Sequence, residues 1–151
     1  MNMYDPRISV IPKRLKKIKN IIGIASAKGG VGKTTIASTL ALLLAKKEKY
    51  RVGLFDLDLH NPSCHVVLGV NNLEFTEERG IIPPKIHDVY FASILPYVGD
   101  NPIPLRGKDI SNAIIELITI INWPLLDYLI IDLPPGLGEA FLETMRFMNM
   151  K

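Results

Sequence analysis

Cysteine is nearly absent from this sequence, whose 151 residues include only Cys64. A lone cysteine cannot form a disulfide within the chain, and it cannot by itself hold a zinc ion or an iron–sulfur cluster. Long apolar runs are missing too. The longest near the start covers residues 40–45, far below the roughly 18–20 residues of a membrane span. We therefore expect neither a disulfide scaffold nor a membrane protein.

The first residues also lack the pattern of a secretory signal, because Asp5, Pro6 and Arg7 are followed by no long apolar core. With 48% hydrophobic and 22% charged residues, the composition is that of a globular protein and excludes a disordered one. Since a domain usually has about 100–200 residues, these features predict a single cytoplasmic domain.

The formal net charge is +3, and basic residues gather near the N-terminus. We interpret residues 1–19 as a basic N-terminal arm, loosely held over 1–12, and residues 20–151 as the folded domain. A basic run can mark a nucleic-acid or membrane surface, or it can be a solvated edge that raises the potential beside an anion site. No aromatic residue interleaves with the lysines at 13–19, so nucleic acid is not the partner we expect.

Strand and helix patterns alternate after the arm. Residues 20–26 form an apolar run typical of a strand buried on both faces, and residues 51–56 form a second strand that ends in a carboxylate. Between them, over 33–47, large apolar residues recur at helical spacing: Ile36, Leu40, Leu43 and Leu44. This βαβ unit predicts an α/β fold with a mostly parallel sheet flanked by helices.

The rest of the chain gives shorter signals. The elements that we expect are a short helix over 62–69, turns with a hairpin over 71–84, a strand over 89–95, a loop over 99–107, a helix over 109–121, a strand over 127–132 and a helix from 138.

Residues 28–35, Lys-Gly-Gly-Val-Gly-Lys-Thr-Thr, carry the strongest functional signal. Glycines let consecutive backbone N–H groups turn inward around a phosphate, and the following helix adds unpaired N–H donors and the positive end of its dipole. Lys33 would supply a charge to the terminal phosphates, and the Thr34 hydroxyl could coordinate Mg²⁺. We therefore expect a nucleotide to be bound by Lys28, Gly29, Gly30, Val31, Gly32, Lys33, Thr34 and Thr35.

Carboxylates at strand ends support this site. Asp56 and Asp132 each close an apolar strand, and the ligands of open α/β sheets bind at the C-terminal ends of strands. Phosphate-bound Mg²⁺ keeps several waters, so we expect Thr34, Asp56 and Asp132 to hold the ion, the acids mostly through water. Asp58 would point the same way if the strand continued, and Gly136 would be free to donate its N–H to a γ-phosphate.

Residues 28–34 resemble the deviant Walker A loop of the ParA/MinD branch of P-loop NTPases, in which an additional lysine precedes two glycines. Within that branch, several segments resemble the Mrp-type iron–sulfur cluster carrier ATPases: Asp56-Leu-Asp58, Asn61-Pro-Ser63, Gly69, Arg106-Gly107, Trp123 and residues 127–136. The resemblance covers nearly the whole chain, with departures at Ala27, Asn61 and Leu137.

This resemblance implies a P-loop NTPase fold, ATP and Mg²⁺ as cofactors, and slow hydrolysis coupled to rearrangement of a homodimer. It assigns catalytic roles to Lys28, which would reach across the dimer to the partner's nucleotide, and to Asp58, which would position the attacking water. It also implies iron–sulfur apo-proteins as clients.

Mrp-type carriers continue through further strands and carry a Cys-x-x-C pair that holds the cluster, whereas this sequence ends shortly after Asp132. We therefore expect a C-terminally truncated member without a cluster ligand set, because Cys64 beside His60 and His65 is not expected to bind metal. An apolar sheet edge would then be exposed beside the Asp132 strand, giving marginal stability or dependence on a partner. Two alternatives stay open: a ParA- or MinD-like positioning ATPase that binds DNA or membrane, and a nucleotide-binding remnant without activity.

Overall fold

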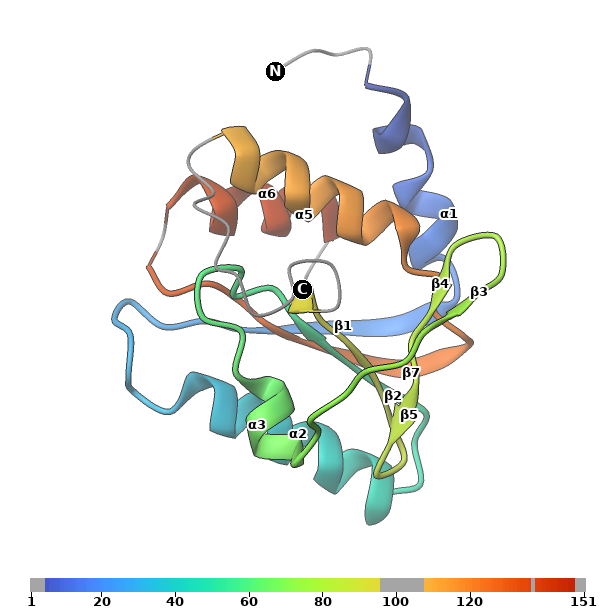
Figure 1. Cartoon of the computed structure of the whole chain (residues 1–151), viewed down its shortest axis with the longest axis vertical. Coiled ribbons are helices and arrows are strands. Elements are labelled where there is room, and N and C mark those ends of the chain that lie inside the picture. The colour runs from blue at the N-terminus through green and yellow to red at the C-terminus, as the bar shows by residue number, and fades with distance from the viewer. Residues whose placement is uncertain (1–4, 96–107, 137, 149–151) are drawn as a thin grey trace.

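The structure, a computed structural model, describes residues 5–95, 108–136 and 138–148. Its centre is a five-stranded sheet in the order β1-β7-β2-β6-β5 (Figure 1). The strands are β1 (Ile18–Ile24), β2 (Val52–Asp56), β5 (Lys85–Ile86), β6 (Val89–Ala92) and β7 (Leu126–Asp132). All neighbours are parallel except β5, which is antiparallel to β6. The predicted mostly parallel α/β sheet is confirmed.

Helices cover both faces of this sheet. On one face lie α1 (Ile11–Leu15), α5 (Lys108–Ile120) and α6 (Glu139–Met148), and on the other lie α2 (Lys33–Lys46) and α3 (Cys64–Leu68) (Figure 1). A separate hairpin joins β3 (Thr76–Glu77) to β4 (Ile81–Ile82), as the turn residues of that segment predicted. The loop predicted over 99–107 lies outside the described residues.

The core has two apolar clusters, one on each face of the sheet. Central strands β2 and β7 serve both, since every residue of β2 is buried. In the cluster under α5, the Phe55 and Trp123 rings pack edge to face with their centroids 5.6 Å apart. Gly53 lies so close to Trp123 that a Cβ there would come within 2.9 Å of the indole. The close packing of β2 against these side chains therefore requires glycine at position 53.

The buried face of α2 differs from the one that its large apolar residues suggested. Ala37, Ala41 and Ala45 face the sheet and are buried, whereas Ile36 and Leu43 are exposed. Small residues at every fourth position allow the helix backbone to approach the strands closely. Of the four large apolar residues at helical spacing, Leu40 and Leu44 pack against the core, whereas Ile36 and Leu43 are exposed.

The N-terminal segment is not loosely held over its described part. Residues Pro6–Ser9 form a 3₁₀ helix that leads into α1, and Ile11 is buried in the core. Arg7 ties the segment to α5 through an ion pair with Glu116 at 3.1 Å. Burial of one apolar side chain and this pair hold the segment on the domain, and β1 begins at Ile18 rather than at residue 20.

Strand β1 lies at the edge of the sheet. It was expected to be buried on both faces, but its residues are half-buried or, at Lys19, exposed. β7, which carries Asp132, is paired on both sides by β1 and β2. The exposed edge is therefore the outer side of β1, and β1 itself lies between this edge and the strand that carries Asp132.

Candidate functional site

The turn between β1 and α2 is a glycine loop with two residues in the left-handed region. Gly30 has φ +75° and Gly32 has φ +90°, conformations that side chains other than glycine rarely adopt. Gly32 is the N-cap of α2, and no side chain caps the helix there. The first N–H groups of α2 therefore stay available at the loop.

A pocket of about 330 Å³ opens over this loop. Its lining comes from the glycine loop, the start of α2 and the segments that follow β2 and β7: Ser26, Gly29, Gly30, Gly32, Lys33, Thr34, Thr35, Asp58, His60, Asn61, Ser63 and Pro135. A Cβ added at Gly29, Gly30 or Gly32 would meet no atom within 4 Å, so the space at the loop is open. This is the shape and chemistry of an anion pocket at a helix N-terminus.

Lys33, Thr34 and Asp132 meet beside this pocket. The Lys33 ammonium lies 2.5 Å from Asp132 Oδ1, and the Thr34 hydroxyl donates to Asp132 Oδ2 at 2.7 Å. Lys33 is also 4.0 Å from Asp58 Oδ2. Strand β7 delivers Asp132 to this point because its last residue pairs with Ile24 at the end of β1, where the loop begins.

Asp56 lies behind the pocket and acts on helix α3. Its Oδ2 accepts the N–H groups of Ser63 and Cys64, both at 3.0 Å, so this carboxylate caps the first turn of α3 in place of the N-cap side chain. Its Oδ1 accepts the Asp58 N–H at 3.1 Å. Burial nevertheless raises the pKa of Asp56 to about 7, because desolvation of the charged form outweighs these donors.

Asp58 lines the pocket, although β2 ends two residues before it. The turn is held by the Asn61 N–H, which donates to Asp58 Oδ1 at 3.2 Å. The side chain is almost completely buried and reaches toward Lys33. The structure therefore brings together Lys33, Thr34, Asp58 and Asp132, as the motifs predicted, with Asp56 directly behind them.

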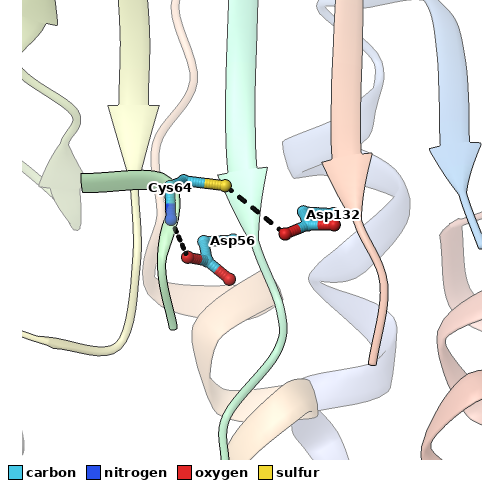
Figure 2. Close-up of side chains that lie close together, drawn as sticks. All are labelled: Asp56, Cys64 and Asp132. Atoms are coloured by element: carbon cyan, nitrogen blue, oxygen red, sulfur yellow. Dashed lines mark hydrogen bonds between the residues drawn. The ribbon is translucent and has the colours of Figure 1, made fainter. Parts of the chain in front are cut away.

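Sequence reasoning assigned no role to Cys64. In the structure its side chain faces two acids, and Figure 2 shows the thiol pointing to Asp132, with Sγ 3.5 Å from Oδ2. Burial, reinforced by the Asp56 charge, raises the pKa of the Cys64 thiol. The thiol is fully buried and stays protonated, so it is not an exposed ligand for a cluster.

Among the described residues, the ligand atoms of Asp56, Cys64 and Asp132 lie within 4.8 Å of one another and could share a metal ion. Two carboxylates beside the Thr34 hydroxyl form a hard oxygen donor set, which suits Mg²⁺. The thiol is too soft a donor to contribute to such a site. The signal that could have located Cys64 is its position at the start of α3, directly after the Asp56 turn.

Three predicted binding residues lie away from the pocket or are already engaged. Lys28 and Val31 are exposed and do not line it. Gly136 was expected to have a free N–H, but this group donates to the Ser26 carbonyl at 2.9 Å, so that expectation was wrong. The bond joins the segment after β7 to the start of the glycine loop.

Among the described residues, the group of potential ligand atoms around Cys64 consists of Asp56 and Asp132 and includes neither His60 nor His65. His60 is exposed at the pocket, and burial lowers the pKa of His65.

Over the described part of the chain, no helix combines the length and hydropathy of a membrane crossing.

Comparison with known proteins identifies the family. Residues 17–151 match the model of the ParA group described as NUBPL iron-transfer P-loop NTPase. The iron–sulfur cluster carrier protein of Pseudomonas fragi is 41% identical over 132 residues, which are 85% of this chain and 46% of that protein. The carrier of Rickettsia felis is 40% identical, with 87% of this chain and 41% of that protein covered. The chain thus spans less than half the length of these curated relatives.

A solved structure agrees with the fold. The nucleotide-binding protein of Archaeoglobus fulgidus in complex with ADP superposes with a TM-score of 0.79 at 32% identity, covering 95% of this chain and 56% of that one. This chain belongs to the NUBPL iron-transfer family of P-loop NTPases, whose curated relatives are iron–sulfur cluster carriers.

Proposed function

We propose that the pocket binds ATP with Mg²⁺ and hydrolyses it slowly, as the nucleotide-binding part of an iron–sulfur cluster carrier. The observation that carries this proposal is the meeting of Lys33, Thr34 and Asp132 at the glycine loop. The ADP bound by the Archaeoglobus fulgidus protein supports the choice of an adenine nucleotide.

Lys33 would exchange one anionic partner for another when the nucleotide binds. In the structure its ammonium is neutralised by Asp132, because an unpaired buried charge would be costly. A phosphate in the pocket offers the ammonium a new partner, together with N–H groups of the glycine loop and of the first turn of α2. This exchange releases the Asp132 carboxylate.

The released carboxylate would then help to hold Mg²⁺. Thr34 would bind the ion directly, whereas Asp132 and Asp56 would hold its water molecules. Asp56 fits an indirect role because its oxygens already accept three backbone N–H groups. When bound, Mg²⁺ would neutralise charge on the phosphates.

Hydrolysis would depend on Asp58 and Lys28. Asp58 lines the pocket and is suited to orient the attacking water. Lys28 is exposed outside its own pocket, so it is suited to act on the nucleotide of a second subunit in a homodimer. Both roles follow the family resemblance.

The cargo would be an iron–sulfur cluster handed to cytoplasmic apo-proteins. The only cysteine in the sequence is Cys64, and it is buried among acids. Cluster ligands would therefore come from another polypeptide segment, and this chain would supply the nucleotide-dependent switch.

A binding titration tests the proposal. A fluorescent ATP analogue is titrated into the chain with and without Mg²⁺, and into Lys33→Met. We expect Lys33→Met to weaken binding by about 10- to 100-fold, because it removes a charge-assisted hydrogen bond worth roughly 1.5–3 kcal/mol. Lys46→Met, at the exposed far end of α2, is the control and should bind normally. No binding by the wild type, or equal binding by Lys33→Met, would favour the remnant alternative.

A further inference from the structure

A thiol and two carboxylates meet behind the nucleotide pocket. Asp56 ends β2, Asp132 ends the neighbouring strand β7, and Cys64 begins α3 (Figure 2). Their ligand atoms lie within 4.8 Å of one another, and all three residues are fully buried. The oxygens of this group suit Mg²⁺, but the sulfur does not, so the complete donor set fits a different class of ion.

The spacing of these atoms is close to that of a tetrahedral zinc site. Bonds of about 2.3 Å to sulfur and about 2.0 Å to oxygen place tetrahedral ligand atoms roughly 3.3–3.5 Å apart. Cys64 Sγ and Asp132 Oδ2 already lie 3.5 Å apart. The other separations exceed the tetrahedral value by at most about 1.5 Å, which small rotations of the carboxyl groups can close. Asp56 Oδ1 accepts one N–H and keeps a lone pair for an ion.

A fourth polar group faces the same cluster from α2. Ser38 is completely buried, and among the described residues its Oγ has no hydrogen-bond partner of suitable geometry. The hydroxyl lies beside the Cys64 thiol. A buried hydroxyl without a partner is costly, and a thiolate would be a stronger acceptor for it than a thiol. Ser38 is therefore placed to give the outer hydrogen bond that commonly supports a metal ligand.

The charges of the cluster also match a divalent cation. Two carboxylates and a thiolate would carry three negative charges, and the Lys33 ammonium paired with Asp132 offsets one of them. An ion of charge +2 would offset the other two, as burial of these groups requires. Thiolate sulfur favours soft or borderline ions such as Zn²⁺ over Mg²⁺.

We propose that Asp56, Cys64 and Asp132 bind a thiophilic divalent cation of the Zn²⁺ class. The ion enters from the pocket, where Thr34 contacts Asp132 Oδ2. A metal–sulfur bond forms at Cys64 as the thiol proton leaves to solvent, and no electron is transferred. Water from the pocket takes the fourth coordination position.

Occupation of this site would exclude Mg²⁺ with its nucleotide, because Asp56 and Asp132 would no longer be free to hold the waters of Mg²⁺. This consequence rests on the proposed function, whereas binding of the thiophilic ion does not. The site was not predicted from the sequence, because Cys64 and Asp132 are 68 positions apart and meet only in the folded chain.

Addition of Co²⁺ to the wild-type chain in thiol-free buffer tests the site directly. Co²⁺ replaces Zn²⁺ in tetrahedral sites, and a thiolate bound to it gives a charge-transfer absorption that oxygen ligands do not give. Cys64 is the only cysteine in the sequence, so this band reports on it alone. We expect the band with equimolar Co²⁺, its displacement by Zn²⁺ and its loss in urea. A folded wild-type chain without the band would overturn the proposal, whether or not it binds nucleotide.

Variants separate the thiolate from other ligands in a Zn²⁺ titration. Cys64→Ser should weaken binding by about 100-fold or more, and Ser38→Ala by about tenfold, because loss of an outer partner alone costs roughly 10- to 100-fold. His60→Gln removes an imidazole at the pocket and should change neither the Zn²⁺ affinity nor the Co²⁺ band. Affinity that falls in His60→Gln and not in Cys64→Ser would overturn the proposal in favour of a pocket histidine.

The effect on nucleotide is measured separately, by titrating the fluorescent ATP analogue with Mg²⁺ in the presence of Zn²⁺. Zn²⁺ should weaken binding to the wild type by about tenfold or more and should affect Cys64→Ser much less. Equal weakening in both chains would overturn the exclusion of Mg²⁺. A chain that shows the Co²⁺ band but binds no ATP would refute the proposed function and support the metal site.

Discussion

Lys33 and Asp132 are 99 positions apart in sequence, yet the ammonium of one lies 2.5 Å from a carboxylate oxygen of the other. The side chains are 7% and 0% exposed, so the pair is shielded from water. The lysine expected to contact phosphate is therefore neutralised by the acid expected to serve Mg²⁺. If the pocket binds phosphate as we propose, that binding and the release of this acid would be coupled through this hydrogen bond.

This pair should be tested by a double-mutant cycle in urea unfolding. Lys33→Met or Asp132→Asn alone leaves a partner without its buried counter-charge, and we expect each to cost about 3–5 kcal/mol of stability. The double variant removes both groups and should cost less than the sum of the single changes, by about 1–3 kcal/mol. Strictly additive effects would contradict the coupling.

Substitutions in the glycine loop should separate folding from binding. Gly32→Ala places a side chain at φ +90° and should cost about 1–2 kcal/mol in unfolding free energy. Gly29→Ala adds a methyl group in open space beside the pocket, so the unfolding midpoint should not change. The added methyl group would keep a phosphate from approaching the backbone N–H groups of the loop. Nucleotide affinity should therefore fall by about tenfold, which corresponds to the loss of one hydrogen bond. A Gly29→Ala chain that binds ATP normally would show that phosphate does not enter the loop.

Lys28 should affect hydrolysis rather than binding. Because this side chain is exposed and outside its own pocket, Lys28→Ala should leave the affinity for an ATP analogue within about twofold of the wild type. Phosphate release should slow by about 10²- to 10³-fold, the range for loss of one preorganised charge in a transition state. If binding weakened as much as in Lys33→Met while turnover per bound nucleotide persisted, Lys28 would serve its own pocket instead.

Asp127 should make part of the stability depend on acid pH. Arg51 and then Lys19 hydrogen-bond to this carboxylate and hold its pKa below the usual value of 3.8. The unfolded chain therefore binds the proton more readily than the folded chain. The stabilisation is present above about pH 4 and is lost as the pH falls further.

Urea unfolding of Asp127→Asn between pH 2 and pH 7 measures this contribution. The unfolding free energy of the variant should fall less than that of the wild type as the pH is lowered, because the variant has no carboxylate at position 127 to protonate. Asp88→Asn, in a surface pair with Lys85 at 3.5 Å, is the control and should keep the wild-type slope. Equal slopes for wild type and Asp127→Asn would refute the assignment.

Local sequence patterns predicted most of the fold and the position of the pocket. The glycine loop between an apolar strand and a helix predicted where the pocket lies, because the backbone conformation of the loop is available to few other residues. Acids at the ends of β2 and β7 located the remaining groups, because parallel strands end at one edge of the sheet.

Features that depend on distant contacts were not predictable in the same way. Which face of α2 packs on the sheet is decided by how closely the helix approaches, and this favoured Ala37 and Ala41 over Ile36. That β1 lies at an edge depends on what pairs with its outer side, which its own composition does not reveal. The engagement of the Gly136 N–H by Ser26 likewise requires knowing the path of a loop 110 positions away.

The hold of Asp56 on α3 extends the influence of the pocket to the surface. This carboxylate accepts the N–H groups that begin the helix, and the same helix displays Val66, which is 69% exposed, and Val67. If nucleotide binding drew this carboxylate away from these two N–H groups, the first turn of α3 would lose its cap. The position of these two exposed valines on the surface would then depend on whether the pocket is occupied.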